Sequence, residues 1–96
     1  MRSLARNLIR DSRIKTTTAK AKELRPYVEK LVTKAKTATV ASRRLVNSRI
    51  MGAPETKKLF DVIAPKYQTR AGGYTRIIRL QNRDLDGSPM SLIEFV

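Results

Sequence analysis

The side chains with the clearest chemistry are four arginines near the start of the chain. Arg2, Arg6, Arg10 and Arg13 follow one another at intervals of four, four and three residues, a spacing that aligns them along one side of a helix. The apolar residues of this stretch gather on the opposite side, namely Met1, Leu4, Ala5, Leu8 and Ile9. Guanidinium groups bind phosphates, and four of them in a stripe repel one another. We therefore interpret the stripe as a surface for RNA or another polyanion, in preference to an ordinary solvated helix face.

The net charge of the chain supports this interpretation. The 96 residues carry 21 Lys and Arg against 8 Asp and Glu, for a formal charge of +13. Residues 1–50 hold 14 basic and 3 acidic side chains, whereas residues 51–96 hold 7 and 5. Because solubility alone needs a much smaller net charge, the sequence predicts a polyanionic partner, with the charge concentrated in the first half.

Catalysis and metal binding are disfavoured by what the chain lacks. It contains no cysteine and no histidine, which removes thiolate chemistry, the usual general base and the commonest metal ligands. The acids Asp61, Asp84 and Asp86 show no spacing that would pair them for proton transfer. We predict that the chain is not an enzyme and has no cofactor, metal site or small-molecule substrate. No apolar run approaches the ~20 residues of a membrane span, so no membrane partner is expected.

A glycine pair offers a second candidate for phosphate chemistry. Gly72 and Gly73 lie between Arg70 and Arg76, and glycine allows a backbone to approach a phosphate closely. A simple turn before a strand explains an isolated Gly-Gly equally well and is the commoner case. Tyr74 follows the pair, and its ring could stack on an unpaired base or belong to the core. The residues alone leave both alternatives open.

The first half of the chain is expected to form a helix, a strand and a longer helix. Residues 1–10 give the amphipathic helix, and residues 13–18 combine β-branched residues with basic and apolar alternation, which is typical of a strand. In residues 19–36 the apolar residues recur at helical spacing and predict a core-facing stripe: Leu24, Val28, Leu31 and Ala35. Pro26 should kink this helix or place its start near Arg25.

The second half is expected to form two more helices and a strand pair. Residues 38–51 give one helix, and Pro54 begins another that Pro65 limits. The second of these helices should bury Leu59, Phe60, Val62 and Ile63. Residues 74–80 and 90–96 are predicted to pair as antiparallel strands. We thus predict a single domain over residues 1–96 of the α+β class, with two layers, the order α-β-α-α-α-β-β, and helices packed on a small mixed sheet.

Several long segments carry a resemblance to a known family. RIKTTTAKAKELR at 13–25, EKLVTKAK at 29–36, KLFDVIAPKYQTRAGGYTRI at 58–77 and LIEF at 92–95 resemble the bacterial-type large-subunit ribosomal protein seventeen family. The resemblance covers nearly the whole chain and implies a leading helix, a strand, three helices and a closing strand pair. It also implies a structural constituent of the large ribosomal subunit that binds folded rRNA near the rim of the polypeptide exit tunnel. The implied location is the ribosome of a bacterial cytoplasm or an organelle matrix, with neighbouring large-subunit proteins as further partners.

Two departures from the family pattern affect the expected RNA contacts. Family members usually begin with a longer basic extension, whereas this chain starts directly at the first predicted helix. The family often has histidine where this chain has Asp11. Within the resemblance, the glycine pair belongs to a GGYTR motif and is expected to form a tight turn that brings Arg70, Tyr74 and Arg76 against RNA.

Each predicted RNA-binding residue is expected to present a cation, a backbone amide or an aromatic ring to RNA. They are Arg2, Arg6, Arg10, Arg13, Lys15, Lys20, Lys22, Arg43, Arg44, Arg70, Gly72, Gly73, Tyr74 and Arg76. Phosphate contacts of this kind position a protein on folded RNA without reading sequence. The alternative is an extra-ribosomal regulatory protein that binds duplex DNA, with residues 38–51 as its recognition helix, including Arg43 and Asn47. Glu23 and Glu29 are expected to screen neighbouring lysines on the helix surface.

Overall fold

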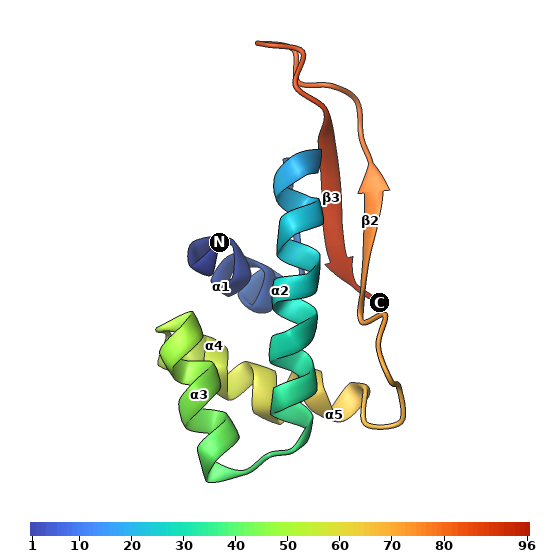
Figure 1. Ribbon diagram of the computed structural model, residues 1–96. Coiled ribbons are helices and arrows are strands. Elements are labelled where there is room, and N and C mark those ends of the chain that lie inside the picture. The colour runs from blue at the N-terminus through green and yellow to red at the C-terminus, as the bar shows by residue number, and fades with distance from the viewer.

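In the computed structural model, which describes residues 1–96, the order of helices and strands matches the predicted α-β-α-α-α-β-β (Figure 1). The elements are α1 (Arg2–Asp11), β1 (Arg13–Thr17), α2 (Thr18–Lys36), α3 (Val40–Ile50), α4 (Ala53–Lys58), the π-helical turn η1 (Leu59–Ile63), α5 (Ala64–Lys66), β2 (Thr75–Arg79) and β3 (Met90–Phe95). The predicted α+β class is confirmed, and α4, η1 and α5 together form the fourth predicted helix.

The sheet has three strands in the order β1-β3-β2, and β3 pairs antiparallel with both neighbours. Ile93 of β3 lies between Ile14 and Ile77 in the register. The prediction of a mixed sheet was wrong, because both strand pairs are antiparallel. β1 and β2 run in the same direction, but the last strand of the chain lies between them, so no parallel pair forms.

The two faces of the sheet have different environments. Side chains alternate along each strand, and the inner face, which includes Ile14 and Ile93, packs against α2 (Figure 1). The hydroxyls of Thr18 on α2 and Ser91 on β3 lie 2.8 Å apart across this interface. The outer face carries the row Arg13, Glu94 and Arg76, and no helix covers it in Figure 1.

The core forms around α2. The predicted stripe is confirmed, because Leu24, Val28, Leu31 and Ala35 are all at most 1% exposed. α1, α3 and the α4–α5 run pack against α2 away from the sheet hairpin (Figure 1). These helices and the inner sheet face contribute to one cluster of 17 buried apolar residues.

Two prolines lie inside helices. α2 begins at Thr18, capped by the Thr17 side chain, and continues through Pro26, so the alternative start near Arg25 was wrong. Pro26 lies on the exposed side, where water can bond the carbonyl that proline leaves without a partner. Before Pro65 the helix widens into the η1 turn, in which the N–H of Ala64 donates to the carbonyl of Leu59. A wide turn costs little here, because proline has no N–H to place.

The predicted core contribution of this helical run is correct except at one residue. Leu59 and Ile63 are buried and Phe60 is half-buried. Val62 is 46% exposed, because Leu59 and Ile63, four residues apart, define the buried side and Val62 lies off it. The run ends at Tyr67, which is buried in the core.

The β2–β3 hairpin extends beyond the helices and gives the molecule extents of 45 × 26 × 18 Å (Figure 1). Its tip turns at Gly87, whose φ is +69°, and the Asp86 carboxylate accepts hydrogen bonds from Arg83 and from the N–H of Ser88. None of the helices combines the length and the apolar composition needed to cross a membrane.

Candidate nucleic-acid interface

The first two arginines of the predicted stripe contact the protein itself. Arg2 Nε donates to the carbonyl of Arg49 at 3.0 Å, and Arg6 Nη1 donates to the carbonyls of Ile50 and Met51 at 3.2 and 3.3 Å. The last carbonyls of a helix have no partner within it. Arg2 and Arg6 therefore cap the C-terminal end of α3 and join it to α1.

The other two arginines of the stripe do not contact α3; Arg10 stays on α1, whereas Arg13 lies on β1. Arg10 forms an exposed ion pair with Asp11 at 3.0 Å, and hydrogen bonding by Arg10 lowers the pKa of the Asp11 carboxyl. Ser12 ends α1 in the left-handed conformation with φ 70°, so Arg13 lies on β1 and not on the helix. The predicted stripe of four was wrong, because this backbone reversal separates Arg13 from the other three.

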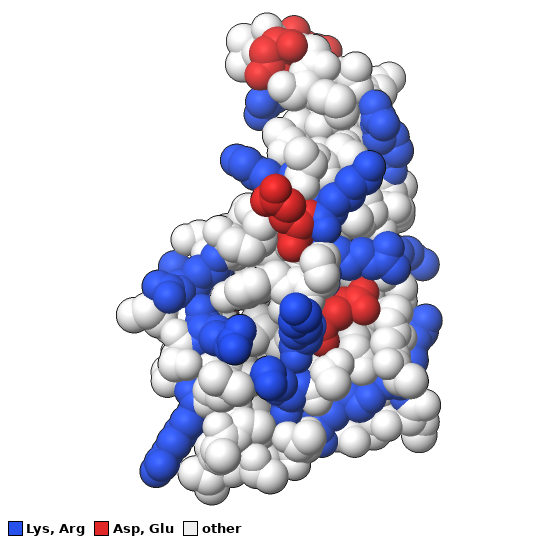
Figure 2. All heavy atoms as spheres, viewed as in Figure 1, with Lys and Arg blue, Asp and Glu red and all other residues white.

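Five further predicted cations are exposed on the surface and form no ion pair. They are Lys15 on β1, Lys20 and Lys22 in the first turns of α2, and Arg43 and Arg44 on α3. Figure 2 shows basic side chains spread over one face of the molecule, with acidic ones at the hairpin tip and in the middle of that face. These positions keep their cations available for phosphate.

The two α3 arginines border a hollow of about 370 Å³ between α3 and α4. The guanidinium of Arg43 lies 5.4 Å from the centre of the Phe60 ring, which holds it by a cation–π contact. Asn47, a candidate base-reading residue of the DNA hypothesis, accepts a 3.1 Å hydrogen bond from Thr56. Because the Oδ1 of that amide is engaged within the protein, it is not free for the paired donor and acceptor contacts that read a base edge, which weakens the case for α3 as a recognition helix.

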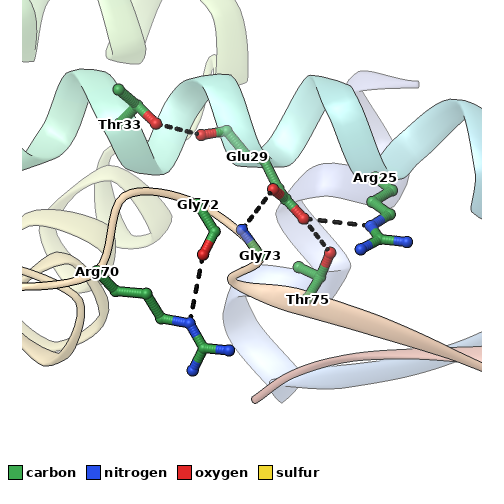
Figure 3. A network of polar contacts seen from close by, with 7 residues as sticks. All are labelled: Arg25, Glu29, Thr33, Arg70, Gly72, Gly73 and Thr75. Atoms are coloured by element: carbon green, nitrogen blue, oxygen red, sulfur yellow. Dashed lines mark hydrogen bonds and ion pairs between the residues drawn. The ribbon is translucent and has the colours of Figure 1, made fainter.

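The glycine pair forms a turn whose amide is occupied (Figure 3). Gly73 has φ +66°, and its N–H donates to Oε1 of Glu29 at 3.2 Å. Arg70 folds back so that its Nε donates to the carbonyl of Gly72 at 3.3 Å. Of the two alternatives for this pair, the structure has the turn, and the Gly73 amide does not face solvent as a phosphate ligand.

Glu29 of α2 organises the start of β2 (Figure 3). Its Oε2 accepts hydrogen bonds from the Thr75 hydroxyl at 2.9 Å and from Arg25 Nε at 3.3 Å. Partial burial raises the pKa of the Glu29 carboxyl, but the hydrogen bonds from Thr75, Arg25 and Gly73 outweigh this and lower it overall. The expectation that Glu29 only screens lysines was wrong, because its carboxylate joins α2 to the glycine turn.

Tyr74 belongs to the core. It is 1% exposed, and its ring centre lies 5.1 Å from that of Tyr67. Its hydroxyl is within hydrogen-bond distance of Thr33 at 3.3 Å and of Lys36 Nζ at 3.1 Å. The interpretation of Tyr74 as an RNA-contacting ring was wrong, because both of its faces are covered by protein.

The last predicted residue, Arg76, lies on the outer sheet face and pairs with Glu94 at 2.6 Å. The predicted residues thus do not gather in one place. Lys20 and Lys22 lie at the start of α2 beside the sheet, whereas α3, which carries the two predicted arginines, lies near the other end of α2 (Figure 1). The sequence analysis did not single out Lys30 and Lys34 on α2 or Arg49 on α3. These three cations line one hollow and form no ion pair with an acid. The four-residue spacing of Lys30 and Lys34 was the available signal.

Comparison with known proteins decides the family. A family model described as "Ribosomal protein L17" matches residues 1–96. The chain belongs to the ribosomal protein L17 family. The resemblance inferred from the sequence is therefore confirmed, and membership in a family of structural ribosomal proteins agrees with the prediction that the chain is not an enzyme.

Three relatives in the L17 family, each named "Large ribosomal subunit protein bL17", are similar over nearly the whole chain. The protein of Sphingopyxis alaskensis is 55% identical over 95 residues, which are 99% of this chain and 68% of the relative. That of Gemmatimonas aurantiaca is 48% identical over 96 residues, 100% of this chain and 81% of the relative. That of Zymomonas mobilis subsp. mobilis is 53% identical over 89 residues, 93% of this chain and 64% of the relative.

Proposed function

We propose that the chain is a structural constituent of the large ribosomal subunit and that it binds and stabilises folded large-subunit rRNA. The observation that carries this proposal is the match of the L17 family over residues 1–96. The named relatives are large-subunit proteins. Residues 1–96 act as one rRNA-binding domain, placed on the ribosome with rRNA and neighbouring large-subunit proteins as its partners.

The charge distribution supports this function physically. Only four of the 21 basic side chains form ion pairs with acids, so most of the positive charge has no counter-charge within the protein. Such cations release counterions when they meet phosphates, which supplies affinity that falls as salt rises. Because they lie at both ends of α2 and on the outer sheet face, the protein can contact several RNA segments at once.

The mode of recognition follows from the kinds of contact available. Lys15, Lys20, Lys22, Arg43 and Arg44 are exposed, and phosphate contacts position a protein without specifying bases. The protein therefore recognises the shape of folded rRNA more than its sequence. The resemblance noted above supports a position near the rim of the polypeptide exit tunnel, which we include in this proposal.

Sedimentation of a lysate through a sucrose gradient in moderate salt tests the function. With the protein followed by mass spectrometry, we expect it to migrate with the large subunit and to remain there after polysomes dissociate. A peak confined to the light fractions would contradict the proposal and would favour a role outside the ribosome.

A further inference from the structure

A second kind of RNA contact is available on α2, beside the end of α3. A hollow of about 380 Å³ lies there, lined by Pro26, Tyr27, Lys30, Lys34 and Arg49, among others. It is the most enclosed of the hollows on the surface, and its volume falls within the range of small-ligand sites. We propose that this hollow holds one unpaired nucleotide of rRNA, with the base against Tyr27 and the phosphates on Lys30, Lys34 and Arg49. This inference rests on the proposed function.

The Tyr27 ring is the aromatic surface suited to a base. It is half-buried, and its hydroxyl donates to the carbonyl of Arg49 at 3.2 Å, which fixes the ring between α2 and α3. Tyr67 and Tyr74 are only 4% and 1% exposed. The guanidinium of Arg43 lies over the Phe60 ring, and Phe95 packs against the core beside Tyr67, with ring centres 6.5 Å apart. Unpaired bases of RNA stack on aromatic side chains that are held in place in this way.

The cations around Tyr27 are free to bind phosphate. Lys30 and Lys34 stand one helical turn apart on α2, and neither they nor Arg49 form an ion pair or donate a side-chain hydrogen bond within the protein. The two lysines also border a second hollow of about 480 Å³ on the side of Gly72. An RNA backbone can therefore cross α2 over the two lysines, with one nucleotide turned into the Tyr27 hollow.

The one acid of the hollow gives the nucleotide a direction. Glu23 lines the same hollow and forms no ion pair. Its carboxylate repels a phosphate and accepts hydrogen bonds from an exocyclic amino group of a base. The base edge therefore faces Glu23 and the phosphates face the lysines.

The test compares two double variants that lose the same charge. Lys30→Gln with Lys34→Gln removes the proposed contacts, and Lys57→Gln with Lys66→Gln removes two exposed lysines that border none of this hollow. In filter binding of purified protein to transcribed large-subunit rRNA, we expect the first pair to lower affinity about tenfold and the second about two- to threefold. Equal losses in the two pairs would overturn the inference.

Ultraviolet crosslinking followed by mass spectrometry identifies the stacked residue. In the wild type we expect a nucleotide attached to Tyr27. In Tyr27→Leu we expect no crosslink on α2 and a several-fold weaker affinity. Tyr27→Phe should fall between the two, because it keeps the ring and loses only the hydrogen bond that fixes it to Arg49. A melting curve for each variant separates loss of contact from loss of fold. The same crosslinking can be done on intact large subunits. If Tyr27 is then attached to a peptide of another protein, the inference is overturned and the hollow belongs to a protein neighbour. Failure of the wild type to bind rRNA at all would instead overturn the proposed function.

Discussion

The hydroxyl of Thr75, the first residue of β2, donates a 2.9 Å hydrogen bond to the carboxylate of Glu29 on α2. The same carboxylate accepts from the N–H of Gly73. One acidic side chain in a strongly basic protein thus ties the long helix to the turn that begins the strand pair.

Replacing this carboxylate should destabilise the fold. Glu29→Ala leaves the Gly73 N–H and the Thr75 hydroxyl without their partner, and we expect it to lower the free energy of unfolding by about 2 kcal/mol. Urea unfolding followed by circular dichroism measures this. Glu23→Ala is the matched control, since Glu23 on the same helix is exposed and forms no ion pair, and it should change the free energy by less than about 0.5 kcal/mol. Equal effects of the two substitutions would remove the proposed role of Glu29.

The same carboxylate predicts a dependence of stability on pH. The folded-state pKa of Glu29 lies below its ordinary value of 4.5, so the unfolded chain takes up the proton at a higher pH than the folded one. The stabilisation is complete above the unfolded pKa and is lost as pH falls through the folded pKa. Unfolding measured from about pH 6 to pH 3 should therefore show a steeper loss in the wild type than in Glu29→Gln. Parallel curves would mean that Glu29 titrates alike in both states.

The two neighbouring glycines should respond differently to alanine. Gly73 has φ +66°, in the left-handed region, whereas Gly72 is outside that region and a Cβ there would meet no atom within 4 Å. We expect Gly73→Ala to cost about 1–2 kcal/mol of stability and Gly72→Ala to be near neutral or slightly stabilising. Thermal melting of both variants decides this. A Gly72→Ala variant that is the less stable of the two would contradict the assigned geometry.

Substituting the arginines that cap α3 should lower stability, whereas substituting exposed lysines should weaken RNA binding and leave stability unchanged. Arg2→Gln with Arg6→Gln removes three hydrogen bonds to the end of α3 and should lower the free energy of unfolding by about 1–2 kcal/mol. Lys20→Gln with Lys22→Gln should leave it within about 0.5 kcal/mol. The lysine pair should nevertheless reduce the dependence of rRNA affinity on salt, with a slope smaller by up to about 2. If the arginine pair leaves the melting temperature unchanged, its capping role is refuted.

Local patterns in the sequence predicted the elements well. The spacing of Leu24, Val28 and Leu31 belongs to α2 alone, and it gave the buried side of that helix correctly. The β-branched residues of 13–17 and 75–79 gave β1 and β2, and the segment after the Asp86–Gly87 turn gave their partner β3. In each case the residues that carry the signal lie within one element, so no knowledge of distant contacts was needed.

The errors concern contacts between distant parts of the chain. The arginine spacing identified a helix side but could not show that Arg6 meets Met51, 45 residues away. Tyr74 could be buried or exposed in an alternating strand until the positions of Thr33 and Lys36 were known. The same holds for β3, whose central place in the sheet depends on where both other strands lie.

The order of strands has a consequence for the newly made chain before it meets RNA. Both outer strands have one unpaired backbone edge, and each carries two basic residues, Arg13 and Lys15 on β1 and Arg76 and Arg79 on β2, whereas the central β3 has none. Unprotected edges invite strands of other copies, and like charges oppose that pairing. Protein synthesised in excess of rRNA should accordingly remain monomeric, and sedimentation of the free protein at low salt should show a single small species. Its positive charge then protects it from self-assembly until rRNA becomes available.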